Sequence, residues 1–229
     1  MTLREMTSGT AAWLDPYLLA RLRGRPEELY CSASHLISHG GKRLRPYLVL
    51  TCCRLAGGRP RQARAAAAAV EMVHNFTLIH DDIMDHDVTR HGVPTVHTQF
   101  GAATGILAGD LLFAKAFEIL AARNGRPAKA ECLALVARLT QACMDLCEGQ
   151  MLDIAMSRSG DLPSEKQYLA MIRKKTASLF EAACALGAMC AGADREVVAS
   201  VSTFGRNLGI AFQLIDDLID VTAGPLRAP

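Results

Sequence analysis

Aromatic side chains are scarce in this sequence, at 5% of its residues, and there is a single tryptophan. Alanine is abundant instead, and this balance favours closely packed helices over a β-sheet. No run reaches the roughly 18 uncharged apolar residues that a membrane-spanning helix requires. The N-terminus also lacks the charged-then-apolar pattern of a signal peptide. We therefore predict an all-α fold, no transmembrane segment and a cytoplasmic location.

Paired cysteine motifs are absent as well. The eight cysteines show no CxxC spacing, and most of them lie in apolar surroundings. This distribution is typical of small core residues in a reducing compartment. Cys143 and Cys147 would share one face of a helix, but without a second ligand pair we do not expect a zinc site.

Acidic residues are missing from residues 29–70, which carry seven lysines and arginines. The next seventeen residues reverse this balance, with five acids and no lysine or arginine. A basic segment followed at once by an acidic one suggests a site where an anion and metal ions meet. The net charge of the whole chain is only +2, and we expect no nucleic-acid partner.

Four of these acids lie within seven positions, directly after an apolar run. On a helix, Asp81 and Asp85 share one face, with Asp82 beside them. Two carboxylates about 4 Å apart repel by roughly 4 kcal/mol at an intermediate effective dielectric, which favours a neutralising cation. Mg²⁺ takes oxygen ligands and usually completes its shell with phosphate oxygens and water, so it is the natural candidate. A solvated acidic face is the alternative.

The chain of 229 residues is long enough to bury a core, and we predict one domain over residues 1–229. Apolar spacing, together with turns at 57–60 and 124–127 and a loop at 90–97, predicts a largely helical chain. The predicted helices cover 10–38 with a break at 24–26, 47–56, 62–84, 100–121, 128–157, a helix capped by Ser164 that carries 173–176, the apolar segment 177–192, and 195–221.

A glycine pair, Gly40-Gly41, opens a basic stretch. Paired glycines let the backbone approach a ligand closely, and Pro46 suits the first turn of the next helix, whose N-terminus favours anions. Lys42 and Arg45 would flank that helix start as a diphosphate clamp. A basic surface loop is the alternative.

The helix predicted over 62–84 places Glu71, His74, Asp81 and Asp85 near one stripe. This stripe predicts an acidic edge that also bears a histidine. His74 alone is more commonly a hydrogen-bonded core residue, but its place two turns before Asp81 makes it a candidate ligand-binding residue.

The acidic pattern recurs on the last predicted helix, where Asp216-Asp217-Leu218-Ile219-Asp220 again reads Asp-Asp-x-x-Asp after apolar residues. The segment Arg173-Lys174-Lys175-Thr176 would supply a second set of cations. One such motif is easily accidental. Two of them, separated by clusters of lysine and arginine, indicate a multinuclear metal site that binds a diphosphate.

These motifs, in this order, resemble those of the trans-isoprenyl diphosphate synthases of the short-chain polyprenyl synthetase type. The similarity runs from about residue 35 to the end of the sequence. The matching residues are Gly40-Gly41-Lys42-Arg43, His74, Asp81-Asp82-Ile83-Met84-Asp85, Arg90, Gly149-Gln150 with Asp153, Lys175-Thr176, and Phe212-Gln213 with Asp216-Asp217-Leu218-Ile219-Asp220. The resemblance implies an isoprenoid synthase bundle of long antiparallel helices around a central cavity, and a homodimer.

The resemblance also implies Mg²⁺-dependent head-to-tail prenyl transfer. An allylic diphosphate ionises, the double bond of isopentenyl diphosphate attacks the cation, and a proton is lost. Three Mg²⁺ ions per site would be bound with the diphosphate. Carried over residue by residue, Asp81, Asp85 and Asp216 hold the ions, supported by Asp82, Asp153, Asp217 and Asp220; Arg90 and Lys175 bind the allylic diphosphate; and Lys42, Arg45 and His74 bind isopentenyl diphosphate. The implied catalytic residues are Lys175, Thr176 and Gln213, of which Thr176 and Gln213 offer oxygens to the carbocation.

In this family, the residues four and five before the first aspartate help to set the depth of the hydrocarbon pocket. Here they are Thr77 and Phe76, which a helical wheel places about 40° and about 140° from Asp81. The small residue in the nearer place should let a farnesyl chain pass, and the larger ring should stop it one unit later. The predicted main product is therefore geranylgeranyl diphosphate.

Two departures from the family pattern matter. The family has a second arginine where this chain has His91, which is only partly charged near neutral pH, so isopentenyl diphosphate would bind more weakly. The family pattern also continues beyond Pro229 with another diphosphate-binding lysine and closing helices, so we expect a fold incomplete at its C-terminal end. These departures leave open a weakly active or inactive family member that serves as a subunit or binding partner. A class I terpene cyclase, which shares the first aspartate cluster, is a further alternative.

Overall fold

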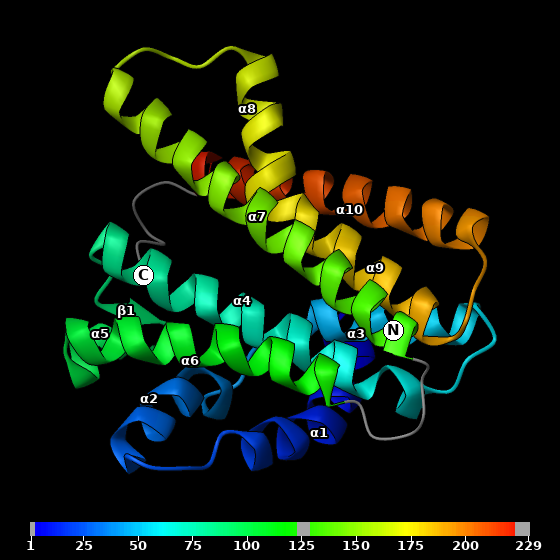
Figure 1. Cartoon of the computed structure of the whole chain (residues 1–229). Coiled ribbons are helices and arrows are strands. Elements are labelled where there is room, and N and C mark those ends of the chain that lie inside the picture. Colours follow the sequence, from blue (N-terminus) through cyan, green and yellow to red (C-terminus); the bar gives the residue numbers. More distant parts are fainter. Residues whose placement is uncertain (1–2, 123–128, 223–229) are drawn as a thin grey trace. The chain divides into compact units, whose positions relative to one another are not determined.

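The computed structural model describes residues 3–122 and 129–222, which are almost entirely helical (Figure 1). The all-α prediction is confirmed, apart from one short antiparallel hairpin of β1 (Thr89–Arg90) and β2 (Val93–Pro94). The helices are α1 (Leu3–Arg21), α2 (Glu27–Ser38), α3 (Leu44–Leu55), the 3-10 helix η1 (Pro60–Ala63), α4 (Arg64–Asp85), α5 (Val96–Phe100), α6 (Ala102–Ala121), α7 (Lys129–Ser159), α8 (Glu165–Ile172), the π-helical turn η2 (Arg173–Ala177), α9 (Ser178–Cys190) and α10 (Arg195–Thr222).

The long helices predicted from the sequence are all present. Their ends differ by up to three residues, except that α1 begins at Leu3, seven residues before the predicted start at residue 10. The sequence pattern does not predict the hairpin, the short helix α5 or the π-helical turn η2. Helix α5 ends at Gly101, whose φ of 87° is a backbone conformation that glycine adopts readily. The turn predicted at 124–127 lies outside the described residues.

The chain divides into two compact units. Of the described residues, the first unit holds 3–47 and 64–122, and the second holds 48–63 and 129–222. The single domain predicted over residues 1–229 stays a prediction.

In the first unit, α4 and α6 pack along one another, and α1, α2 and α5 lie against this pair (Figure 1). The alanine run 65–69 on α4 is almost completely buried. Because alanine has the smallest side chain of the good helix formers, this half of α4 can be approached closely by its neighbours. The other half of α4 carries the candidate site residues.

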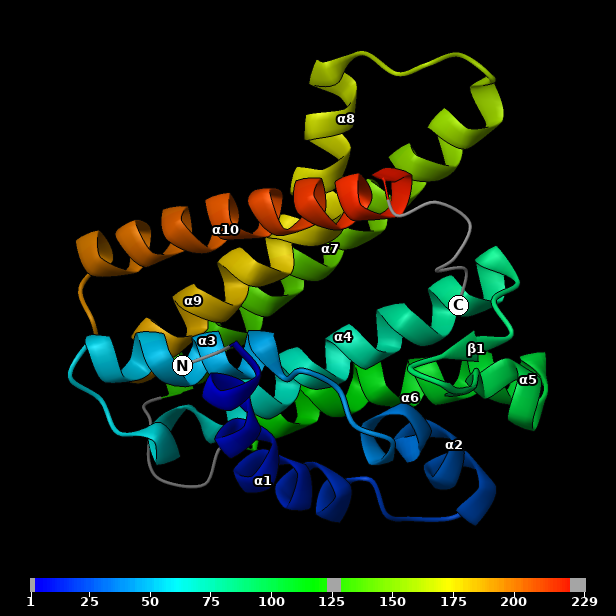
Figure 2. The ribbon, with the colours of Figure 1, turned by 180° about the vertical axis from the view of Figure 1, so that it is seen from behind.

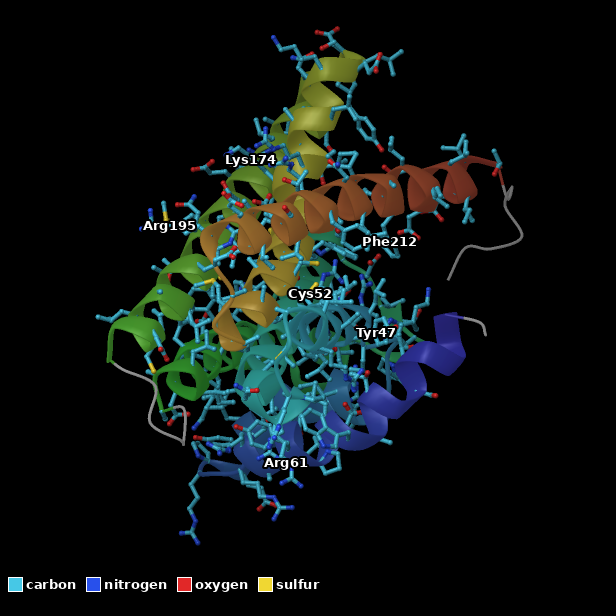
Figure 3. The ribbon with its side chains drawn as sticks, turned by 90° about the vertical axis from the view of Figure 1, so that its right-hand side faces the viewer. Tyr47, Cys52, Arg61, Lys174, Arg195 and Phe212 are labelled. Carbon is cyan, nitrogen blue, oxygen red and sulfur yellow. The ribbon has the colours of Figure 1, made fainter. Side chains whose placement is uncertain are left out.

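In the second unit, α9 packs against both α7 and α10, and α10 runs along α9 (Figure 2). Gly205 and Gly209 bring the two helices together, since a Cβ on either would lie 2.6 Å from atoms of the α9 segment or the turn before it. The rings of Phe180 on α9 and Phe212 on α10 then pack 5.4 Å apart (Figure 3 labels Phe212). This close packing fixes the face of α10 that carries the second acidic motif.

The N-terminal cap predicted at Ser164 is present, with a capping box in which the Ser164 hydroxyl accepts from the Gln167 backbone. None of the eight cysteines, all of which lie in the described residues, forms a disulfide, and five of them are buried. In the described part of the chain, no helix is long and apolar enough to cross a membrane.

Candidate active site

The C-terminal end of α4 carries the first acidic motif. Asp81 is half-buried, Asp85 is exposed, and Asp82 is fully buried. Because Asp81 and Asp85 lie one turn apart on one face, their oxygens suit a shared cation. Asp82 differs from them, because burial raises the pKa of its carboxyl to about 6 even though Arg90 opposes the rise.

Arg90 is held in place by two carboxylates. The β1–β2 hairpin brings its Nε within 2.5 Å of Asp82 Oδ1 and its Nη2 within 3.3 Å of Asp87 Oδ2. The hairpin itself is pinned by the buried Thr95, whose hydroxyl donates to the Asp87 carbonyl oxygen at 2.8 Å. The predicted diphosphate ligand Arg90 is therefore positioned before any ligand arrives.

His91 lies next to Arg90 at the turn of the hairpin and is exposed. Desolvation, followed by the positive charge of Arg90, lowers the pKa of its imidazole below the usual value. His91 is therefore mostly neutral near pH 7, and the second cation of the family pattern is missing at this position.

The glycine pair makes room for a buried arginine. Arg43 is 4% exposed and donates to Asp15 Oδ1 at 2.8 Å and to Glu71 Oε1 at 3.0 Å. A Cβ on Gly41 would lie 2.4 Å from Arg43 Nη1, so the close approach at Gly41 is to this guanidinium. Glu71 is consequently buried in an ion pair and does not contribute to the exposed acidic edge predicted for α4.

Arg45 and His74, both predicted ligands of isopentenyl diphosphate, are brought together. Arg45 Nη1 lies 3.3 Å from His74 Nε2, and because arginine can only donate, that ring nitrogen must be the acceptor. Burial, then the positive charge of Arg45, holds the pKa of His74 well below its usual range. Burial lowers the pKa of Arg45 only to about 10, so it stays cationic at neutral pH. Lys42 is exposed at the start of this segment.

The two predicted chain-length residues lie in different settings on α4. The Thr77 hydroxyl donates to the His74 carbonyl oxygen at 2.8 Å, within its own helix. The Phe76 ring packs 5.1 Å from the ring of Phe113 on α6, which in turn lies 5.0 Å from Phe117. The sequence interpretation missed Phe113 and Phe117, although their spacing of four residues is that of one helix face.

The π-helical turn η2 positions Lys175, the predicted catalytic cation of the second unit, and its neighbour Lys174. A Cβ on Gly149 of α7 would lie 2.2 Å from the Lys175 backbone nitrogen, so only glycine permits this approach. Lys175 Nζ then lies 2.5 Å from Asp153 Oδ2, also on α7. Lys174, labelled in Figure 3, pairs with Asp145 and Glu148 instead. The two adjacent lysines are thus directed to different carboxylates of one helix.

Thr176 and Gln213, two predicted catalytic residues, are hydrogen-bonded to one another in the second unit. The Thr176 hydroxyl donates to Gln213 Oε1 at 2.8 Å, and Gln213 Nε2 donates to Asp217 Oδ1 at 2.7 Å. The other Asp217 oxygen accepts from the hydroxyl of Tyr168, which the sequence interpretation missed. Burial and the bond to Asp217 raise the pKa of Tyr168 to about 12, so its phenol keeps its proton.

These groups line a cavity of about 370 Å³ in the second unit. The polar residues that line it are Asp153, Ser157, Tyr168, Lys175, Thr176, Gln213 and Asp217, and the apolar ones are Met156, Pro163, Met171 and Ile172. A lining that combines a cation with soft apolar side chains suits a ligand with an anionic head and a hydrocarbon chain.

The remaining predicted metal ligands, Asp216 and Asp220, are exposed on α10. Within residues 3–122 and 129–222, no three histidine, cysteine or carboxylate side chains converge to form a metal site by themselves. Mg²⁺ is commonly bound by one or two carboxylates together with substrate phosphates, and the Asp81–Asp85 pair fits that kind of site. The metal ligands stay predictions.

Comparisons with known proteins show the family of the chain. Residues 26–227 match the family model of the polyprenyl synthetases. The chain belongs to the polyprenyl synthetase family. It is 46% identical over 200 residues to the geranylgeranyl diphosphate synthase of Methanosarcina mazei, covering 87% of this chain and 60% of that protein. It is 41% identical over 215 residues to the geranylfarnesyl diphosphate synthase of Natronomonas pharaonis, covering 87% of this chain and 62% of that protein.

Among solved structures, the geranylgeranyl pyrophosphate synthetase of the archaeon Geoglobus acetivorans matches with a TM-score of 0.90 and 41% identity, covering 96% of this chain and 71% of that chain. The predicted isoprenoid synthase fold is thereby confirmed. The chain spans about three fifths of the length of the curated polyprenyl synthetases it matches.

Proposed function

We propose that the chain carries out Mg²⁺-dependent head-to-tail prenyl transfer from an allylic diphosphate to isopentenyl diphosphate. The observation that carries this proposal is the end of α4, where Asp81 and Asp85 lie one turn apart and Asp82 fixes Arg90. Two oxygen ligands and an oriented guanidinium are the groups that a metal-bound diphosphate requires.

The proposed ligands of the two diphosphates are side chains that carry a positive charge at neutral pH. Arg90 would bind the allylic diphosphate, and Lys42 and Arg45 would bind isopentenyl diphosphate. His74, being neutral, would orient Arg45 through their hydrogen bond and would not itself neutralise a phosphate. Asp81, Asp85 and Asp216 would hold the Mg²⁺ ions, which supply positive charge to the leaving diphosphate.

Bond breaking leaves an allylic carbocation, which the protein must stabilise without capturing it. The Thr176 hydroxyl oxygen and the Gln213 amide oxygen offer lone pairs but are far weaker nucleophiles than a carboxylate. The double bond of isopentenyl diphosphate then forms the new carbon–carbon bond to the cation, and the resulting cation loses a proton. A dry cavity strengthens each of these electrostatic contacts.

Geranylgeranyl diphosphate is the product we propose, because Thr77 is small and the Phe76 ring is backed by Phe113. Relatives at similar identity are named for geranylgeranyl and for geranylfarnesyl diphosphate, so the chain length depends on details of this wall. We also propose a homodimer, as the family resemblance implies. The eight cysteines without a disulfide support a reducing, cytoplasmic location.

The test is turnover by the purified chain with MgCl₂, farnesyl diphosphate and labelled isopentenyl diphosphate. We expect a C20 diphosphate, its loss on removal of Mg²⁺, and its loss in Asp81→Ala. Asp161→Ala, an exposed carboxylate on the loop before α8, is the matched control and should retain activity. A cyclic hydrocarbon product would instead indicate a terpene cyclase.

A weakly active subunit is the second candidate, favoured by the neutral His91 in place of a cation. In that case, the pure chain would give no product, and adding a full-length family member would restore more product than the added protein forms alone. His91→Arg should then raise the affinity for isopentenyl diphosphate in the pure chain.

A further inference from the structure

Tyr168 makes a contact that the proposed reaction does not use. Its hydroxyl on α8 donates to Asp217 Oδ2 on α10, and Asp217 Oδ1 accepts from Gln213 Nε2. Gln213 Oε1 in turn accepts from the Thr176 hydroxyl on η2. One chain of hydrogen bonds therefore links three elements of the second unit, and all four of its members line the cavity.

The direction of this chain is fixed by the chemistry of its members. An ionised carboxylate only accepts hydrogen bonds, so the Gln213 amide must turn its NH₂ towards Asp217 and its oxygen towards Thr176. Thr176 then donates its only hydroxyl proton to Gln213, which leaves its oxygen lone pairs for the cavity. With the opposite direction, Thr176 would present a proton to the cavity and would repel a carbocation.

We propose that Tyr168 and Asp217 are positioning residues that set the orientation of the Gln213 amide and, through it, of the Thr176 hydroxyl. The inference rests on the proposed function in one respect, that Thr176 and Gln213 face the carbocation. It gives Asp217 a role different from that of its neighbours Asp216 and Asp220. Both Asp217 oxygens receive hydrogen bonds inside the second unit, whereas those two neighbours are exposed.

A spectroscopic test of the orientation needs no turnover. In protein labelled with [¹⁵N]glutamine, the Gln213 side-chain signal is the one lost in Gln213→Glu. We expect Tyr168→Phe to shift this signal and to speed solvent exchange of its NH₂ protons about tenfold, because Asp217 loses a hydrogen bond. Asp217→Asn should shift it further, since an asparagine can offer Gln213 a donor and let the amide turn over. Tyr30→Phe, on α2 of the first unit, is the matched control and should leave the signal unchanged.

Turnover with Mg²⁺, farnesyl diphosphate and isopentenyl diphosphate gives the second readout. We expect Tyr168→Phe to lower kcat about tenfold, with unchanged KM for both diphosphates and an unchanged Mg²⁺ requirement, because only the transition state carries the cation. Asp217→Asn should likewise lower kcat at an unchanged Mg²⁺ requirement. Asp216→Asn, by contrast, should raise the Mg²⁺ concentration that gives half-maximal rate.

Two results would overturn the inference. An unchanged Gln213 signal in both Tyr168→Phe and Asp217→Asn would show that these residues do not orient the amide. A raised Mg²⁺ requirement in Asp217→Asn, equal to that of Asp216→Asn, would make Asp217 a metal ligand. If the wild-type chain forms no product, the proposed function fails, but the spectroscopic result still decides the inference.

Discussion

His74 is a neutral imidazole surrounded by positive charge. Burial is the main cause of its lowered pKa, and Arg45 and Arg43 add to it. In the unfolded chain, a histidine takes up a proton near pH 6.5. Since the folded chain resists that proton, the stability contributed by neutral His74 is fully present above about pH 6.5 and is lost as the pH falls below it.

The substitution His74→Gln tests this pH dependence. Glutamine keeps an acceptor for Arg45 but cannot be protonated. Between pH 7 and pH 5, we expect the free energy of unfolding of the wild type to fall by up to roughly 2 kcal/mol more than that of the variant. Urea unfolding at both pH values measures the difference. His39→Gln is the control and should lose as much unfolding free energy between pH 7 and pH 5 as the wild type. An equal loss in His74→Gln would contradict the prediction.

Asp82 and Arg90 should act as one unit, because the buried carboxylate holds the guanidinium. Inorganic diphosphate with Mg²⁺ is a simple probe, with its affinity measured by calorimetry. We expect Asp82→Asn and Arg90→Gln each to weaken binding about tenfold, and the double variant to bind no worse than Arg90→Gln. In the double variant of Asp85→Asn and Arg90→Gln, by contrast, we expect the two losses of binding free energy to add up. Full additivity of the Asp82 and Arg90 effects would point to Asp82 as an independent metal ligand.

At the scale of elements, the turn η2 depends on one glycine of a neighbouring helix. A π-helical turn adds a residue to the local winding and often occurs at functional sites. Here the extra residue turns Lys174 and Lys175 towards different carboxylates of α7. This arrangement requires the backbone of α7 and that of η2 to touch at Gly149.

Gly149→Ala should therefore destabilise the protein by roughly 1–3 kcal/mol, the typical cost when an atom is forced into a packed site. The comparison is Gly9→Ala on α1, where a Cβ would meet no atom within 4 Å. That change should stabilise the protein by roughly 0.5–1 kcal/mol, because alanine loses less backbone entropy in a helix. Urea unfolding of both variants measures the two changes in the free energy of unfolding, which we expect to be opposite in sign. An unchanged stability in Gly149→Ala would mean that η2 shifts to make room for the added atom.

Sequence reasoning identified the long helices because each repeats its apolar residues over several turns. The hairpin could not be predicted, because strands of two residues are too short to show an alternation of apolar and polar residues. The turn η2 could not be predicted either, because its winding depends on the contact between Lys175 and Gly149, which lies 26 residues earlier in the chain. Local patterns thus predict elements of three turns or more, and tertiary contacts determine the short elements between them.

At the scale of the whole molecule, the order of the motifs was enough to indicate the family, but not to separate the carboxylates by role. Asp81 and Asp82 are adjacent in sequence, yet one is half-buried and the other is fully buried against Arg90. Asp216 and Asp217 differ in the same way, since Asp217 accepts two hydrogen bonds and Asp216 is exposed. Such differences depend on partners that are distant in sequence, such as Tyr168. The spacing of residues within a motif cannot predict these partners.

Product length is a property of the whole molecule that these contacts make testable. Phe76 of α4 and Phe113 and Phe117 of α6 form a row of three rings, with successive centroids 5.1 Å and 5.0 Å apart. Removing one ring should leave the next as a new end wall. We therefore expect Phe76→Ala to shift the main product from the C20 to the C25 diphosphate, and Phe76→Ala with Phe113→Ala to extend it further. Phe204→Ala, exposed on α10, should not change the length. Chromatography of the products decides, and an unchanged C20 product in the double variant would place the end wall elsewhere.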